Sequence, residues 1–199
     1  MEKEKAIPFF LDALELKEMV RNLWVFSKVP GGESVAAHSF NVALLAFLLG
    51  AERKGLNLSK SIKLALIHDI HEAKTGDIIE DWKVEALKID PAALGKGKHG
   101  VSGAEKKQLE KEGMKEMIRC LPAPLQNTLT ALWNEFEEQK TAEAQFVRSV
   151  DKLDLLLQAF AYEKKHAMDF SKIFAHLNNA PPDKEIAALA EFLKTLRKK

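Results

Sequence analysis

Apolar residues recur three and four positions apart along almost the whole 199-residue chain, which is the period of one face of an α-helix. No stretch alternates apolar and polar residues around a tight turn, as a β-hairpin does. The pattern therefore predicts an all-α fold. Helices are expected over these approximate ranges: 8–22, 34–54, 59–74, 103–119, 123–138, 142–166 and 183–197, with a shorter one near 170–177.

The chain has the length of one ordinary domain, and no repeat, low-complexity tract or linker divides it. A single domain over residues 1–199 is therefore predicted. The least regular segment is 80–102, where four turn-forming residues stand among charges: Pro91, Gly95, Gly97 and Gly100. This composition predicts a surface loop, and such a loop beside a site is a candidate lid.

Composition excludes several classes of function. The net charge of +1 gives no basic excess for binding a nucleic-acid polymer. Cys120 is the single cysteine, which rules out an intramolecular disulfide and indicates a reducing compartment. The longest apolar run, 42–49, is far shorter than the ~20 residues that span a bilayer, and the first residues lack the apolar core of a signal peptide. A cytoplasmic protein that does not bind membranes is expected.

Two of the apolar stripes contain a residue that does not belong in a core. His38 lies in register with Val35 and Val42 on the helix expected over 34–54, and Asp151 lies in register with Val147 on the helix over 142–166. A buried, unpaired carboxylate costs several kcal/mol unless it is neutralised, hydrogen-bonded or bound to a cation. Taken alone, His38 is more simply a satisfied core histidine, and Asp151 a helix cap or the partner of an arginine.

A third helix carries the adjacent pair His68-Asp69 directly after the apolar run 64–67. Three inward helices that each carry His or Asp would need three separate sets of partners, whereas one divalent cation satisfies them all. Two imidazoles with two carboxylates suit Mn, Fe, Co, Ni or Zn better than calcium. Glu72 lies one turn beyond His68, and Asp77 follows Gly76, so both can reach the same cavity without binding the metal.

These residues resemble the H…HD…D pattern of the HD superfamily, which consists of all-helical, metal-dependent phosphohydrolases. The extended pattern resembles the YfbR-like and HD-domain-containing 5′-deoxynucleotidases, and it covers about 14–163, with the expected C-terminal helices over 168–199 appended. It consists of H-D-x-x-E-A-x-x-G-D-I at 68–78, L-W-x-E-F-E at 132–137, T-A-E-A-x-F-V at 141–147 and D-K-L-D-x-x-L-Q-A-x-x-Y-E at 151–163.

The resemblance implies a helical bundle with one divalent transition metal in its core, bound by His38, His68, Asp69 and Asp151. It also implies that Glu72 and Asp77 are the catalytic carboxylates that do not bind the metal. Substrate-binding roles are implied for three further residues, since R-x-x-W and E-S-V segments precede the first ligand: Arg21, Trp24 and Ser34.

The residues alone leave simpler roles open for these three. Arg21 would form a surface ion pair with Glu15 or Glu18, Trp24 would pack in the core, and Ser34 would cap its helix. The resemblance implies a small-molecule nucleotide substrate, hydrolysis of deoxyribonucleoside 5′-monophosphates and a homodimer. Alternatives are an HD phosphohydrolase acting on a dNTP, a cyclic nucleotide or a guanosine polyphosphate, and a non-catalytic HD module that binds a metal or nucleotide.

Overall fold

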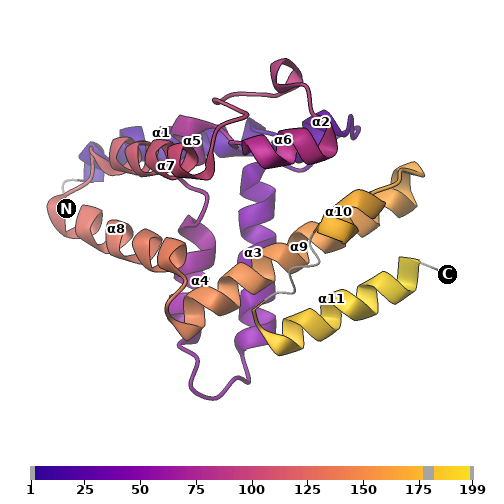
Figure 1. The fold of residues 1–199 in the computed structure, drawn as a ribbon. Helices are drawn as coiled ribbons and strands as arrows, with labels where there is room; N and C mark the ends of the chain where they lie inside the picture. Colours follow the sequence, from indigo (N-terminus) through magenta and orange to yellow (C-terminus); the bar gives the residue numbers. More distant parts are fainter. Residues whose placement is uncertain (1–2, 177–181, 198–199) are drawn as a thin grey trace. The chain divides into compact units, whose positions relative to one another are not determined.

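The computed structural model describes residues 3–176 and 182–197 (Figure 1). Within these ranges the chain forms helices and no β-strand, so the predicted all-α fold is confirmed. None of the described helices is both long enough and apolar enough to cross a bilayer. The helices are η1 (Lys3–Ala6), α1 (Ile7–Glu18), α2 (Asn22–Phe26), α3 (Val35–Gly50), α4 (Leu58–Ile67), α5 (Glu72–Thr75), α6 (Asp81–Leu87), η2 (Pro91–Ala93), α7 (Gly103–Ile118), α8 (Ala123–Glu138), α9 (Ala142–His166), α10 (Ser171–His176) and α11 (Lys184–Arg197).

The chain groups into two compact units, and each is assembled from two separate stretches. Unit 1 comprises residues 1–39 and 67–133, and unit 2 comprises 40–66 and 134–199. The first passage between the units falls inside α3, and the second falls at the end of α4. The single domain over 1–199 stays a prediction.

In unit 1, α5 packs against α1 and α7. Apolar positions of these helices supply half of a buried core cluster, as their three- and four-residue spacing predicts, and neighbouring segments supply the rest. The removal of these side chains from water is the main stabilising contribution to the unit. This cluster consists of Ala6, Leu16, Val35, Ile67, Ala73, Met114, Met117, Ile118, Leu121 and Trp133.

The helix expected over 59–74 is broken in the structure. α4 ends at Ile67, and α5 begins at Glu72. Between them the backbone makes tight i→i−3 hydrogen bonds, in which Ile70 N–H donates to the Ile67 carbonyl and Glu72 N–H to the Asp69 carbonyl. Adjacent residues of a continuous helix diverge by about 100°. At the break His68 and Asp69 face the same point, since His68 Nε2 lies 3.1 Å from Asp69 Oδ2.

The segment 80–102 is more regular than its composition suggested, because it contains α6 and η2. Its last part, residues 95–100, is tied to the residues around Gly76 by hydrogen bonds. The Gly100 N–H donates to the Ile79 carbonyl (2.8 Å), and Lys96 Nζ donates to the Ala73 carbonyl (2.7 Å). We call residues 95–100 the strap. The prediction of an irregular segment over the whole of 80–102 is therefore wrong, whereas its surface position is confirmed, since most of its described residues are exposed or partly exposed.

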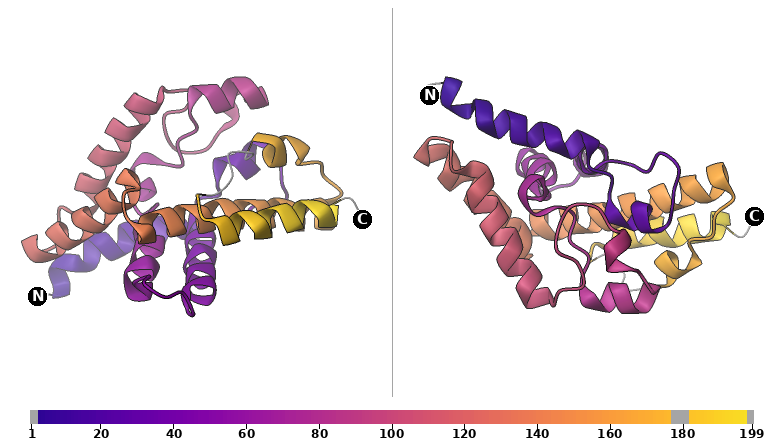
Figure 2. Two further views of the ribbon diagram at one scale, coloured as in Figure 1. Left: turned by 60° about the horizontal axis from the view of Figure 1, so that its bottom comes forward. Right: turned by 90° about the horizontal axis from the view of Figure 1, so that it is seen from above.

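Unit 2 is built on α9, which begins and ends where the sequence predicted. The Thr141 hydroxyl caps it by accepting a hydrogen bond from the Ala144 N–H (3.2 Å). α10 and α11 both pack against α9, and Figure 2 shows α9 and α11 side by side. The face of α11 that is buried carries Ile186, Ala190 and Leu193 at the spacing of one helical stripe.

Lys60 links α4 to two carboxylates of unit 2. Its Nζ lies 2.8 Å from Glu135 Oε1 and 2.9 Å from Glu143 Oε2. Burial opposes the ionisation of both carboxyl groups. Hydrogen bonds from Lys60 to both, from Thr141 to Glu135 and from the Asn57 N–H to Glu143 outweigh that effect and lower both pKa values.

Replacing Lys60 by methionine is expected to reduce the free energy of unfolding at pH 7 by about 1 kcal/mol. A lowered carboxyl pKa stabilises the folded protein above the unfolded-state pKa, and that contribution is lost as the pH falls. Urea unfolding should therefore give converging stabilities for wild type and variant as the pH falls below about 4. Lys63→Met, at an exposed position of the same helix, is the control. A stability difference between wild type and Lys60→Met that is as large below about pH 4 as at pH 7 would contradict the role assigned to Lys60.

Candidate metal centre

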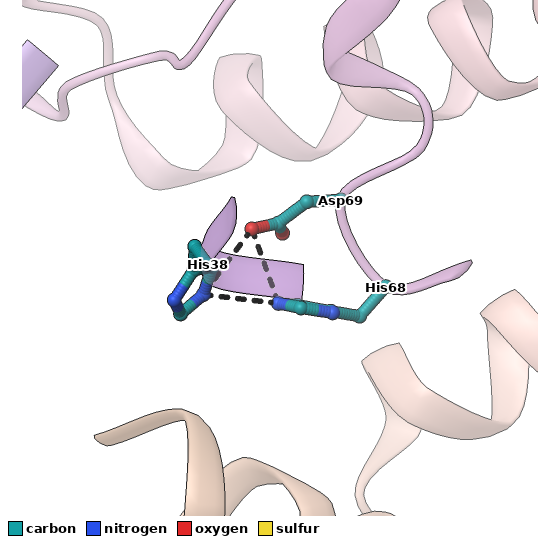
Figure 3. A group of neighbouring side chains, drawn as sticks. All are labelled: His38, His68 and Asp69. Carbon is teal, nitrogen blue, oxygen red and sulfur yellow. Dashed lines mark hydrogen bonds and ion pairs between the residues drawn. The ribbon is translucent and has the colours of Figure 1, made fainter. Parts of the chain in front are cut away.

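Three of the four predicted ligands lie together in unit 1. His38 Nε2 lies 3.3 Å from His68 Nε2 and 3.7 Å from Asp69 Oδ2, while His68 Nε2 lies 3.1 Å from Asp69 Oδ2. Figure 3 shows the two imidazole rings and the carboxylate pointing toward one another. Both rings are buried, and Asp69 is partly exposed. Three donor atoms thus converge on one point.

This donor set fits a divalent transition metal. The ligand atoms of His38, His68 and Asp69 all lie within 4.8 Å of one another. A cation at their centre would satisfy two ring nitrogens and one carboxylate at once. Mixed nitrogen and oxygen ligands are typical of Zn, Mn, Fe, Co and Ni sites, whereas calcium takes oxygen ligands.

The charges around Asp69 favour its ionised form. Burial opposes ionisation, but His68, His38 and Arg21 together hold the pKa of this carboxyl well below its ordinary range. The group is therefore an anion, which is the state a metal ligand needs.

Glu72 and Asp77 lie close to this group in the sequence. Glu72 stands at the start of the short helix α5, and Asp77 stands just beyond its end. Glu72 is its first residue and is buried, and its N–H donates to the Asp69 carbonyl (3.0 Å). Burial and the negative charges of Asp69 and Asp77 raise the pKa of Glu72 well above its usual value. Asp77 follows Gly76, whose φ of +73° and ψ of 170° end α5. A carboxyl whose pKa is raised in this way is typical of groups that transfer protons.

Lys106, on α7, supplies positive charge beside these carboxylates. Burial opposes its charge, but Glu110, Asp77 and Glu72 raise the pKa of its ammonium group. Its Nζ lies 3.4 Å from Glu110 Oε1, and Glu110 in turn lies 3.6 Å from the buried His71. The carboxylate cluster therefore has a compensating cation within its own unit.

Arg21 and Trp24 both contact Glu33. Arg21 Nη1 lies 3.2 Å from Glu33 Oε1 and 3.1 Å from His38 Nδ1. The Trp24 indole N–H donates to the same Glu33 oxygen (2.9 Å), and the Trp24 side chain has no exposed surface. Arg21 thus pairs with Glu33, a partner that the sequence did not suggest. The geometry of Trp24 favours the core-packing interpretation over stacking on a base.

Ser34 caps α3. Its Oγ accepts a hydrogen bond from the Ala37 N–H (3.2 Å). The residue also forms an isolated bridge with Val20, which fixes the start of the helix that carries His38. This is the capping role that the residue type favours on its own.

Asp151 lies on α9, in unit 2. Its side chain is partly exposed, and its Oδ2 lies 3.7 Å from Arg148 Nη1. The assignment of Asp151 as the fourth metal ligand stays a prediction from the sequence.

Two residues that surround the site were not assigned a role from the sequence. Glu33 contacts both Arg21 and Trp24, and the buried Asn22 donates two hydrogen bonds to Asp77. Neither belongs to an apolar stripe of a long helix, so no periodicity marks them. A sequence signal for both was their position next to residues with predicted roles. Asn22 stands between Arg21 and Trp24, and Glu33 directly precedes Ser34.

A profile of the HD domain family matches residues 13–190. Among curated proteins, the chain is 36% identical over 149 residues to the Bos taurus protein named 5′-deoxynucleotidase HDDC2, covering 75% of this chain and 63% of the relative. It is 32% identical over 165 residues to the Dictyostelium discoideum protein of the same name, covering 80% and 78%. The chain thus spans less than two thirds of the length of the bovine and human relatives, of which it covers 63% and 64%.

Two solved structures are similar to this chain over nearly its whole length. A conserved hypothetical protein from Pyrococcus furiosus is 29% identical with a TM-score of 0.71, covering 97% of this chain and 99% of the other. A protein from Pyrococcus horikoshii OT3 is 25% identical with a TM-score of 0.70, covering 95% and 96%. The match of the HD domain profile to most of the sequence, together with these relatives, shows that the chain belongs to the HD-domain family.

Proposed function

We propose that the protein is a metal-dependent phosphohydrolase that converts deoxyribonucleoside 5′-monophosphates into deoxynucleosides and phosphate. The observation that carries the proposal is the convergence of His38, His68 and Asp69 on one point, with the carboxylates Glu72 and Asp77 next in the chain. Its choice of substrate rests on the curated relatives, which are named 5′-deoxynucleotidases.

In this proposal, His38, His68 and Asp69 hold one divalent transition metal, and the sequence pattern adds Asp151 as a fourth ligand. A metal held in this way supplies Lewis-acid chemistry and lowers the pKa of a bound water. The protein orients the two rings and keeps Asp69 ionised through the positive groups around it.

Glu72 and Asp77 handle the protons of the reaction. Hydrolysis breaks the bond between phosphorus and O5′, forms a bond between phosphorus and the water oxygen, and moves one proton from the water to the leaving O5′. Two carboxyl groups divide this transfer, since one accepts the proton of the water and the other delivers a proton to O5′. The raised pKa of Glu72 supports its participation.

Arg21 is the proposed phosphate-binding group. Its planar guanidinium matches phosphate oxygens and stays charged at every relevant pH. Glu33 holds it by an ion pair, and Trp24 holds the same Glu33 oxygen. We therefore assign Trp24 to the support of Arg21, and Ser34 to the position of the helix that carries His38.

The test is phosphate release by protein that has been stripped with a chelator and resupplied with Mn, Co, Zn or Mg. We expect metal-restored release from 5′-dAMP, with AMP, 3′-dAMP and dATP as poor substrates. Glu72→Ala should bind the metal and fail to turn over. Release that is fastest from dATP would favour another HD phosphohydrolase, and stoichiometric metal binding without turnover of any substrate would favour a binding module.

A measurement of metal retention tests Asp151. The Asp151→Asn variant should retain less metal after dialysis than wild type, measured as metal per chain, because one anionic ligand becomes a neutral amide. Glu72→Ala, which is expected to keep its metal, is the control. Equal metal content in the Asp151 variant and wild type would remove Asp151 from the ligand set.

We also propose a homodimer, with an apolar face of α3 in the contact. Four large apolar side chains of this helix are exposed at helical spacing, at 41% to 64% of their surface: Phe40, Leu44, Phe47 and Leu48. Monomeric proteins seldom leave such a stripe in water. α9 contributes none of the large exposed apolar side chains found among the described residues.

Light scattering is expected to give the mass of two chains for wild type and of one chain for the Phe40→Glu, Phe47→Glu double variant. Two buried negative charges cannot be tolerated in an apolar contact. Phe192→Glu, which changes an exposed residue of α11, is the control. A double variant that stays dimeric would exclude this face.

A further inference from the structure

Asn22 joins three segments of unit 1 that are far apart in the sequence. Its backbone N–H donates to Asp77 Oδ2 (2.6 Å), and its side-chain Nδ2 donates to the Asp77 carbonyl (2.6 Å). Its side-chain Oδ1 accepts from the N–H of Gly95, in the strap (2.7 Å). The residue is 2% exposed. A buried amide with both ends engaged in this way cannot rotate without losing hydrogen bonds.

The strap fixes which end of the amide faces Asp77. A backbone N–H can only donate and a backbone carbonyl can only accept, so Gly95 selects Oδ1 and leaves Nδ2 for the Asp77 carbonyl. The strap is held on both sides of Asp77 by the bonds from Lys96 Nζ to the Ala73 carbonyl and from the Gly100 N–H to the Ile79 carbonyl. The orientation of Asn22 is therefore set by backbone groups.

These contacts orient Asp77 in turn. One of its carboxylate oxygens, Oδ2, is engaged by an N–H donor, and its backbone is held by the same residue. Hydrogen bonds to an ionised acceptor are about twice as strong as neutral ones. Oδ2 is thus the oxygen through which Asn22 holds the Asp77 carboxylate.

Asn22 also follows Arg21 directly. The Arg21 N–H donates to the Glu33 carbonyl (3.0 Å), and the Arg21 guanidinium lies 3.2 Å from the Glu33 carboxylate. The proposed phosphate-binding group and the contact that orients Asp77 therefore belong to two consecutive residues. The two residues are joined by one peptide unit, and the Glu33 ion pair holds the guanidinium of the first.

We propose that Asn22 is a positioning residue, which, with the strap, holds the Asp77 carboxylate in register with the phosphate at Arg21. The inference rests on the proposed phosphohydrolase function. A misplacement of about 1 Å at a reacting group can cost about a hundredfold in rate. Asn22 would therefore act on turnover through Asp77, without touching the substrate.

The test is a double-mutant cycle on 5′-dAMP hydrolysis, with kcat and KM measured separately. Asn22→Ala and Asn22→Asp are each made in wild type and in the Asp77→Asn background. Asn22→Asp keeps the size of the side chain and the acceptor for Gly95, so it serves if Asn22→Ala does not fold. Metal content and melting temperature are recorded for every variant.

In the otherwise wild-type protein, we expect Asn22→Ala and Asn22→Asp to lower kcat ten- to a hundredfold. KM and metal content should stay within threefold of the wild-type values. In the Asp77→Asn background the same substitutions should change kcat little further, because the carboxylate that Asn22 positions is already lost. An equal loss in both backgrounds would show a merely structural role and overturn the inference. A folded variant with unchanged kcat would overturn it too. If wild type releases no phosphate from 5′-dAMP, the proposed function itself fails first.

Discussion

The Glu72→Gln variant is expected to lose at least a hundredfold in kcat for 5′-dAMP while it keeps one metal per chain. Glutamine has the size of glutamate but cannot exchange a proton, and proton transfer by a positioned side chain contributes about 10² to 10⁴ in rate. Glu72 is buried beside Asp69 and Asp77, whose charges and whose burial raise its pKa. Steady-state kinetics and metal analysis on the same preparation measure the effect.

The melting temperature distinguishes this loss of turnover from unfolding of the variant. Because the ionised form of Glu72 is disfavoured in the folded, metal-free protein, the neutral glutamine should leave the melting temperature of the metal-free variant at or above that of wild type. Glu110→Gln is the matched control, since Glu110 is a similarly buried carboxylate of the same unit. A Glu72→Gln variant that turns over within threefold of wild type would exclude Glu72 from the chemistry.

The Gly76→Ala substitution is expected to reduce both stability and turnover. A Cβ at this position would lie 1.8 Å from the Lys96 carbonyl oxygen and 2.4 Å from the Lys96 carbonyl carbon. The backbone conformation of Gly76, with φ +73° and ψ 170°, is one that other residues adopt only with strain. Strain and overlap with the strap together should cost about 3 kcal/mol or more in the free energy of unfolding.

Gly31→Ala separates the collision from the backbone conformation. Gly31 also has a positive φ, +63°, but no atom lies within 4 Å of a Cβ built there. Its replacement should cost only about 1–2 kcal/mol. Urea unfolding and kcat are measured for both variants, and Gly76→Ala should lower kcat as well, since the strap holds Asn22 and through it Asp77. Equal effects of the two substitutions would mean that the strap moves aside freely.

Helical spacing was enough to predict most of the fold. α8 and α9 begin and end at the expected residues, because each has a long apolar stripe and clear boundary residues such as Thr141. The break between α4 and α5 was missed, since the apolar pattern continues through it. At the break, i→i−3 hydrogen bonds replace the helical pattern, and the side chains of His68 and Asp69 meet. Apolar periodicity does not record such a local change of the backbone.

The candidate site was predictable in part for the same reason. His38 was marked by its place in an apolar stripe, and His68-Asp69 by its motif, and the structure brings these three together. The contacts of Asn22 were not predictable, because they depend on backbone atoms of Asp77 and Gly95, whose positions no side-chain pattern records. The strap illustrates this too, because its glycines predicted a loop and its hydrogen bonds made it a fixed one.

The three proposed ligands in unit 1 lie beside two of the three points where the chain crosses between the two units. The chain leaves unit 1 after Ser39 and re-enters it at Ile67, one residue from a ligand in each case. An ion bound to His38 and His68, 30 positions apart, would close that excursion into a ring. In the chain-entropy model, a covalent link over a loop of this length destabilises the unfolded chain by about 3.6 kcal/mol. The metal would then act as a reversible cross-link. Its removal should speed amide hydrogen exchange where the chain crosses between the units, at 39–40 and at 66–67.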